Sequence, residues 1–398
     1  MLRAITNAVR DGGWLTTARM RLWAAALLVG FAAALVFLFA AAHGAFDYRG
    51  RPLGTDFSCL YAAGRLAAAG APDAAYDFVR ENARLHALFG AGAPLYGWFY
   101  PPFFLPVAAA LSALPYLAAL AAWTVLGLAL YLAAMALLAK PLNRREWLLY
   151  ALAFPAAFVN LIHGQNGFLT AALFAGALAL LDRRPLVAGA LFGCLCYKPQ
   201  FALLAFFALA AGKCWKPLAA AAGTAAGLAA AATLAYGAGI WHAFAASSRL
   251  AREFVLEQGG PGFEKIQSLF AFVRHAGGPV DFAYLAQAVV SALVLAAVLK
   301  LWRSPARTAL KGAGLVLGTL AFTPYVTDYD MVLAAPAILF MASDGIAYGF
   351  RPYEKSALAL LWLTPMAARA VAGAVYFPLG FAAVALAFAL VVRRAVRI

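Results

Sequence analysis

The chain contains long runs of apolar residues without any Lys, Arg, Asp or Glu. Such runs cover residues 22–46, 99–139, 147–181, 217–248 and 370–392. One transmembrane helix needs about 20 apolar residues, so several runs hold one helix and some hold two. Hydrophobic residues make up 65% of the chain and charged residues 12%, whereas soluble domains have about 45–50% and about 25%. The composition excludes a soluble globular enzyme and a disordered chain, and it predicts an all-α polytopic membrane protein.

The positions of the basic residues predict the direction of each span. The net charge is +15, and because Lys and Arg collect in cytoplasmic loops, we expect no nucleic-acid partner. Residues 1–21 carry four arginines and form the expected cytoplasmic N-terminus. Alternating sides from there gives about 12 transmembrane helices with both termini in the cytoplasm. The expected spans are residues 22–42, 117–139, 147–161, 168–181, 186–197, 201–211, 218–236, 282–299, 315–325, 332–341, 356–371 and 377–392.

Two long segments are expected on the outer, periplasmic side of a single integral membrane domain that covers residues 1–398. The first is residues 44–116, whose amphipathic helices are expected to lie in the membrane interface, and the second is residues 237–281. Four prolines between residues 101 and 115 interrupt helices, so we expect residues 103–114 to lie at the interface and not to span. The expected location is the bacterial inner (plasma) membrane, with the working surface on the outer face.

A carboxylate shortly after the first span is the most informative polar residue. Asp56 stands in the segment Gly-Thr-Asp-Phe-Ser at residues 54–58, at the expected boundary between lipid and water. This position resembles that of the acidic residue in the C-type membrane glycosyltransferases, and the chain resembles glycosyltransferase family 87 more closely. The resemblance covers residues 22 to 276 and is carried by Asp56-Phe57, Tyr61, Gly70, Tyr100-Pro101-Pro102-Phe103, Leu114-Pro115, Trp123, Gly164-Gln165-Asn166, residues 188–193, Lys198-Pro199 and Gln267-Ser268-Leu269.

The resemblance implies a C-type glycosyltransferase fold and transfer of a hexose, expected to be mannose, from a polyprenyl-phosphate sugar donor to a lipid or glycan acceptor. A phosphate-linked sugar has a good leaving group, so only the acceptor hydroxyl needs a base. One carboxylate therefore suffices, in contrast to the two of a glycoside hydrolase. Asp56 is the expected general base, and direct displacement inverts the anomeric centre. The alternative for Asp56 is a helix N-cap ahead of Phe57, where Asp is a favoured residue.

Further polar residues are expected at the same outer level. Lys198 is a lone charge between two short apolar segments, so we expect it to hold the donor phosphate; the alternative is a lysine that snorkels to the interface. Arg274 and His275 in the second loop are further phosphate candidates. Sugar or acceptor hydroxyls are expected to contact His163, Gln165, Asn166, Tyr325, Asp328 and Asp330. For residues 163–166 the alternative is ordinary turn chemistry.

No metal and no other cofactor is expected, because two acidic residues alone make a weak metal site. We expect Asp56 to line an outer cavity that also exposes Lys198. Gly189 and Gly193 are expected to border a lateral groove for the isoprenoid chain or, alternatively, to pack two helices together. A transporter or lipid flippase is the alternative function, and the nearly charge-free interiors of the spans weigh against it. A non-catalytic scaffold does not explain the cluster of polar residues.

Overall fold

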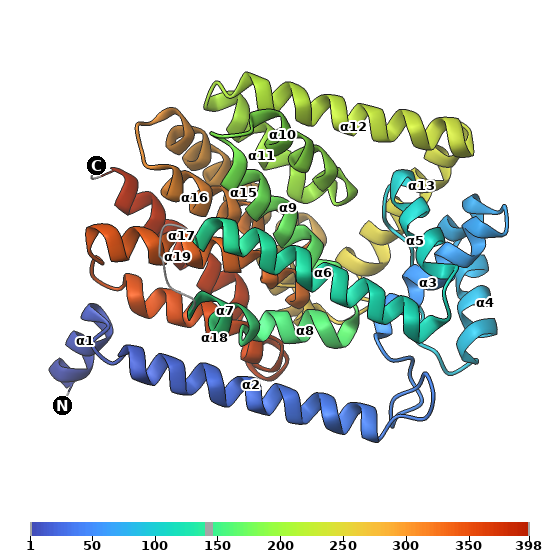
Figure 1. Cartoon of the computed structure of the whole chain (residues 1–398), viewed down its shortest axis with the longest axis horizontal. Coiled ribbons are helices and arrows are strands. Elements are labelled where there is room, and N and C mark those ends of the chain that lie inside the picture. The colour runs from blue at the N-terminus through green and yellow to red at the C-terminus, as the bar shows by residue number, and fades with distance from the viewer. Residues whose placement is uncertain (1, 140–145, 397–398) are drawn as a thin grey trace.

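The computed structural model describes residues 2–139 and 146–396, and these residues form helices and no strand. A helix satisfies its backbone hydrogen bonds internally, as apolar surroundings require. Figure 1 shows the helices packed in one bundle. In chain order they are α1 (Leu2–Asp11), α2 (Thr17–Ala40), α3 (Thr55–Ala68), η1 (Pro72–Tyr76), α4 (Phe78–Phe89), η2 (Pro102–Phe104), α5 (Leu105–Ser112), α6 (Tyr116–Ala139), α7 (Glu146–Leu152), α8 (Pro155–His163), α9 (Gly167–Leu180), α10 (Pro185–Cys194), η4 (Leu195–Tyr197), α11 (Pro199–Ala211), α12 (Trp215–Tyr236), α13 (Gly239–Leu250), the π-helix η5 (Ala251–Glu257), η6 (Phe263–Lys265), α14 (Leu269–His275), α15 (Val280–Arg303), α16 (Thr308–Phe322), η7 (Asp328–Leu333), α17 (Ala334–Tyr348), α18 (Glu354–Val375) and α19 (Leu379–Val396).

Seven helices of the described residues are long and apolar enough to cross a membrane, which confirms an all-α polytopic protein. The number becomes eight if α7 and α8, which meet at an angle of 49°, form one broken span. The lengths do not establish the 12 expected spans, because α10 has only ten residues and α11 has 13. Hydropathy cannot separate a span that faces lipid from a short helix that is buried in protein. The short basic segment at residues 140–145, expected on the inner side, lies outside the described residues.

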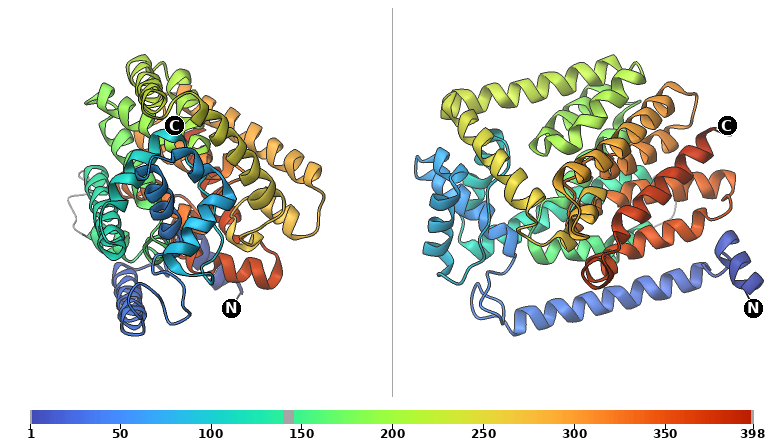
Figure 2. Two further views of the ribbon diagram at one scale, coloured as in Figure 1. Left: turned by 90° about the vertical axis from the view of Figure 1, so that its right-hand side faces the viewer. Right: turned by 180° about the vertical axis from the view of Figure 1, so that it is seen from behind.

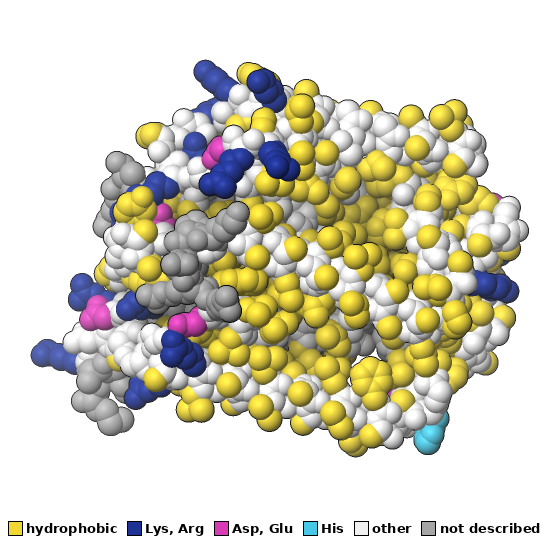
Figure 3. Space-filling view, in the orientation of Figure 1, with side chains coloured by type: hydrophobic (Ala, Val, Ile, Leu, Met, Phe, Trp, Pro, Cys, Tyr) yellow, Lys and Arg dark blue, Asp and Glu magenta, His cyan; other side chains and the backbone are white. Residues whose placement is uncertain are grey.

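The two ends of the bundle differ in structure and in charge. Both described ends of the chain lie at one end, whereas α3, α4, α5 and α13 lie at the other (Figures 1 and 2). On the face shown in Figure 3, Lys and Arg side chains gather at the end that holds the termini. We call these the terminal end and the loop end. The described ends of the chain and the helices of the two long loops thus lie at opposite ends of the molecule.

The loop end is a compact layer built from both long loops. Helix α5 has eight residues, too few to span, and it packs across α3, where a Cβ on Gly64 would overlap the Ala108 carbonyl. The second loop joins this layer because Ser247 Oγ donates a hydrogen bond to the Trp98 carbonyl oxygen at 2.8 Å. The helix expected within residues 103–114 therefore belongs to the loop layer.

Gly189 and Gly193 lie at a tight contact between α10 and α12. A Cβ on Gly189 would overlap the Pro217 carbonyl oxygen, and one on Gly193 would lie 2.6 Å from the Ala221 carbonyl oxygen. Backbones that approach this closely leave no room for an isoprenoid chain between them. Helix packing therefore accounts for both glycines, as in the alternative given for them. A groove along other faces of residues 186–211 stays a prediction.

Gly189→Ala is expected to destabilise the protein, because the added methyl group meets backbone atoms that cannot move aside. Overpacking of this kind costs about 1–3 kcal/mol. Gly223→Ala in α12 is the matched control: nothing lies within 4 Å of its Cβ position, and Ala is the better helix former. Thermal unfolding in detergent should give a lower midpoint for Gly189→Ala than for wild type. Equal midpoints for the two variants would contradict the packing interpretation.

Candidate active site

Two glycine turns bring Asp56 next to the turn between α8 and α9. Gly54 precedes α3 with a φ of +64°, and Gly164 follows α8 with a φ of +62°, both in the left-handed region that favours glycine. A Cβ on Gly164 would lie 2.7 Å from the Cβ of Phe57, so any larger residue would separate the turns. Trp123 Nε1 fixes the same turn by donating to the Gly164 carbonyl oxygen at 3.1 Å.

Asp56 stands in the first turn of α3 but is not its N-cap. The helix starts at Thr55, and its N-cap is Gly54, without a capping side chain. Gln165 Nε2 donates to Asp56 Oδ2 at 2.8 Å, and His163 Nδ1 lies 4.0 Å from Asp56 Oδ1. The Thr55 hydroxyl lies 2.9 Å from His163 Nδ1. Thr55 Oγ1 also donates to Asp56 Oδ1, at a long distance of 3.4 Å. With 19% of its side chain exposed, Asp56 is held mainly through Oδ2 and is accessible.

Arg369 lies at this site, and the sequence analysis did not select it. It stands near the end of α18, and its Nη1 lies 3.9 Å from Asp328 Oδ2. The charge of Asp328 also interacts with those of His163 and Asp56, so four charged or ionisable groups gather here. The Arg369 side chain is 45% exposed, while that of Asp328 is 7% exposed. A signal was present: Arg369 is a lone charge in an apolar segment, as Lys198 is.

Lys198 is buried and already paired. Its Nζ donates to Asp330 Oδ1 at 2.5 Å, and the two side chains are 6% and 3% exposed. The other oxygen of Asp330 accepts from the backbone N–H and the hydroxyl of Thr327. The rings of Phe201 and Tyr329 lie 5.4 and 5.5 Å from the ammonium. The structure thus places Lys198 in an internal ion pair, where the phosphate contact expected for it would require Asp330 to move away.

The remaining candidates divide into two groups. Asn166 donates to the Tyr100 hydroxyl at 2.7 Å and is buried. Tyr325 interacts electrostatically with both Asp56 and Asp330, so it lies near the site. Arg274 instead donates to the carbonyl oxygens of Glu257 and Gly278 within the second loop. His275 packs against the rings of Phe263 and Tyr376.

The second loop reaches the site through Gln267 rather than through Arg274. The backbone N–H of Gln267 donates to the Val326 carbonyl oxygen at 2.7 Å, beside the segment with Asp328 and Asp330. A cavity of about 400 Å³ lies elsewhere, at the terminal end, and neither Asp56 nor Lys198 lines it. The expected cavity shared by these two residues stays a prediction, and the buried pair of Lys198 with Asp330 weighs against it. Within residues 2–139 and 146–396, no three His, Cys, Asp or Glu side chains form a metal-binding group.

The chain matches the model of glycosyltransferase family 87 over residues 98–324, more than half of its length. No curated protein and no solved structure matches it. A helical membrane bundle with this match is a membrane glycosyltransferase. The chain belongs to glycosyltransferase family 87. The matched residues include His163, Gln165, Lys198 and Arg274, whereas Asp56 lies outside them. The match also extends beyond residue 276, at which the resemblance described in the sequence analysis ends.

Glu81 is a buried carboxyl group beneath the site that the sequence analysis did not select. It lies in α4 and is 1% exposed. Its two oxygens accept hydrogen bonds from the Cys59 thiol at 3.0 Å and from the Trp98 backbone N–H at 2.7 Å. Burial disfavours the charged form and raises the pKa of Glu81 to about 8. A neutral Glu81 therefore holds α3, α4 and the Trp98 segment together.

The raised pKa of Glu81 predicts a stability that falls with rising pH. Because the folded state holds the proton more tightly than the unfolded state, this contribution is complete below about pH 4.5 and is lost as the pH rises through about 8. Thermal midpoints should therefore be lower at pH 8.5 than at pH 6. Glu81→Gln, which stays neutral, should reduce this difference. An undiminished pH dependence in the variant would assign it to other groups.

Proposed function

We propose that this protein transfers a hexose, expected to be mannose, from a polyprenyl-phosphate sugar to a lipid or glycan acceptor. The reaction takes place at the loop end, on the periplasmic face of the inner membrane, with both termini in the cytoplasm. A C-type glycosyltransferase fold with further short spans is part of this proposal. Family membership supports the class of reaction. The accessible Asp56 carboxylate, held by Gln165 within the family match, is the observation that carries the proposed site.

Asp56 acts as the general base in this proposal. The acceptor hydroxyl gives its proton to the Asp56 carboxylate while its oxygen attacks the anomeric carbon. The bond from that carbon to the phosphate oxygen breaks, and the bonding electrons leave with the polyprenyl phosphate. Attack opposite the leaving group inverts the anomeric centre. Gln165 donates to Oδ2 at 2.8 Å, whereas Oδ1 makes a longer contact of 3.4 Å with the Thr55 hydroxyl and lies 4.0 Å from His163. Oδ1 is therefore the oxygen that takes the proton in this proposal.

Arg369 holds the donor phosphate in this proposal, and Lys198 supports the fold. A guanidinium group matches phosphate oxygens with two parallel hydrogen bonds. Arg369 is half exposed beside Asp328, at the same site as Asp56. The Lys198 charge, in contrast, is neutralised by Asp330. Arg274 and His275 contact the second loop and would contribute to phosphate binding only through a rearrangement of that loop.

Asp56→Asn is expected to lower sugar transfer by about 100-fold or more, because the amide cannot accept the proton. Membranes that contain wild type or variant are supplied with radiolabelled polyprenyl-phosphate mannose, and transfer to the endogenous acceptors is counted. Asp73→Asn is the matched control from the same loop. Its side chain is 61% exposed and pairs with Arg80 at the surface, so full activity is expected. Equal transfer by wild type and Asp56→Asn would exclude Asp56 as the base.

Arg369→Gln and Lys198→Met are expected to fail in different ways. Arg369→Gln should raise the KM for the donor and leave the thermal midpoint unchanged. Lys198→Met should lower the stability by about 3–5 kcal/mol, because it leaves the Asp330 charge buried without a partner. Adding Asp330→Asn to Lys198→Met should restore much of the midpoint. A stable Lys198→Met with weakened donor binding, together with an unchanged KM in Arg369→Gln, would reverse the two assignments.

A further inference from the structure

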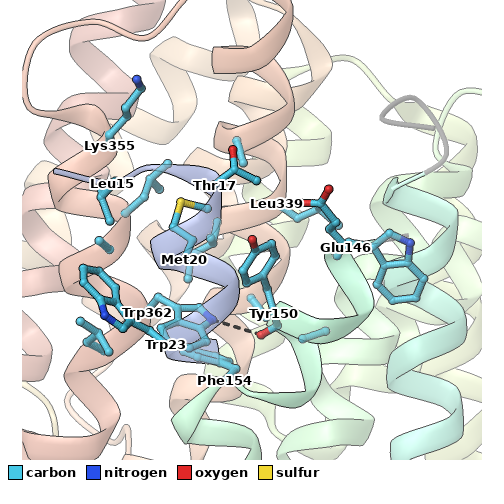
Figure 4. A pocket seen from close by; sticks show the side chains of 18 of the residues that line it. Leu15, Thr17, Met20, Trp23, Glu146, Tyr150, Phe154, Leu339, Lys355 and Trp362 are labelled. Carbon is cyan, nitrogen blue, oxygen red and sulfur yellow. Dashed lines mark hydrogen bonds between the residues drawn. The ribbon is translucent and has the colours of Figure 1, made fainter. Parts of the chain in front are cut away.

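A cavity of about 400 Å³ lies at the terminal end between α2, α7, α17 and α18 (Figure 4). Its volume is within the range of about 300–1,000 Å³ that is typical of ligand pockets. Its walls are mainly apolar and aromatic, with Trp23 from α2, Tyr150 from α7 and Trp362 from α18. Trp362 Nε1 is satisfied by the Tyr150 carbonyl oxygen at 3.1 Å. The Tyr150 hydroxyl is a polar group of the lining without a hydrogen-bond partner among the described residues. The rest of the lining is mainly apolar and favours an apolar occupant.

The cavity exists because α2 stands away from the bundle. Figures 1 and 2 show α2 running along one side of the molecule, and Ala24 is its one buried residue within the described chain. Arg21 pairs with Glu146 at the terminal end of the cavity, and Phe31 stacks on Phe158 at 4.3 Å farther along. Since α2 is a candidate membrane span, lipid is the expected medium around this gap.

One side chain that lines the cavity carries a charge without an acidic partner. No carboxylate lies within 4.0 Å of the Lys355 ammonium in the described parts of the chain, and the ring of Phe350 lies 5.4 Å from it. Glu146, the acidic residue at the cavity, is neutralised by Arg21. Gly12 packs closely on the stem of Lys355 and restricts its position. The rim is thus cationic next to an apolar interior, which matches an anionic headgroup with an acyl chain.

We propose that this cavity binds an anionic phospholipid of the leaflet at the terminal end, with an acyl chain between α2 and α18 and the phosphate at Lys355. The site is distinct from the donor site: Lys355 and Arg369 lie near opposite ends of α18, about 21 Å apart at about 1.5 Å per residue. The bound lipid fills the gap that α2 leaves. This inference does not depend on the proposed glycosyl transfer.

Native mass spectrometry of the delipidated full chain in detergent tests the proposal, with phosphatidylglycerol as the anionic probe and phosphatidylethanolamine as the zwitterionic one. Wild type should retain phosphatidylglycerol with about five-fold preference, the factor that corresponds to about 1 kcal/mol for one lysine at an anionic surface. Lys355→Gln should abolish the preference. Lys216→Gln, an exposed lysine at the start of α12 at the same end (Figure 1), is the control and should keep it.

Filling the cavity tests the acyl-chain position. Ala359→Trp from α18 and Ala342→Phe from α17 both add bulk to its lining, and each should reduce retention of both lipids while the thermal midpoint shows that the variant is folded. Equal retention of the two lipids by wild type, or equal behaviour of Lys355→Gln and Lys216→Gln, would overturn the proposal. Retention of long-chain polyprenyl phosphate in place of phosphatidylglycerol, lost in Ala359→Trp, would also overturn it and assign the cavity to an isoprenoid tail.

Discussion

The contact between the turns at Gly54 and Gly164 determines where the candidate site can form. Both glycines adopt left-handed φ angles, and their neighbours leave no space for a side chain: a Cβ on Gly54 would lie 2.6 Å from the Leu120 side chain. This contact joins the first long loop to the α8–α9 turn across more than 100 residues of sequence. Asp56 and Gln165 each follow one of these glycines closely, so the approach of the two backbones brings their side chains together.

Charged residues that are paired inside the bundle stabilise the fold, whereas charged residues without a close partner can bind a ligand. Asp344 accepts from both Arg307 and Arg394, and Arg394 also donates to Glu354, so one buried ion network joins α16 through α19 at the terminal end. Lys198 and Asp330 form a second buried pair. Removing one partner from such a pair would leave a buried charge without a counter-charge, which is strongly destabilising. This cost explains why the buried charges of these two clusters are paired.

Two basic side chains, Arg369 and Lys355, lack a close acidic partner among the described residues. Arg369 makes one long contact of 3.9 Å with Asp328 and is 45% exposed. Lys355 lines an apolar cavity and has an aromatic ring as its described neighbour. Both belong to α18, one near each end. A cation that the fold leaves without a close anion at the edge of a membrane is suited to bind a phosphate group supplied from outside the protein.

Composition and apolar runs were sufficient to predict an all-α polytopic membrane protein. The sequence also placed Asp56 and Gln165 at one level, and a hydrogen bond joins these two side chains. These signals were insufficient for Lys198, because a lone charge in an apolar segment looks the same whether it faces a cavity or an acidic partner 132 residues away. The same limit explains why the sequence analysis did not select Arg369, because its neighbours at the site come from other segments of the chain. The 12 expected spans did not follow from the lengths because residues buried in protein and residues that face lipid are equally apolar. Glycines likewise mark close approach without showing whether a helix or a ligand is the neighbour.

The family match begins at residue 98 and excludes Asp56, yet the shorter hydrogen bond to the Asp56 carboxylate comes from inside the match. Gln165 holds one carboxylate oxygen, and His163 stands 4.0 Å from the other. Trp123, also within the match, fixes the turn that presents both residues. The matched segment therefore supplies a preformed position for a carboxylate, and the first loop supplies the carboxylate.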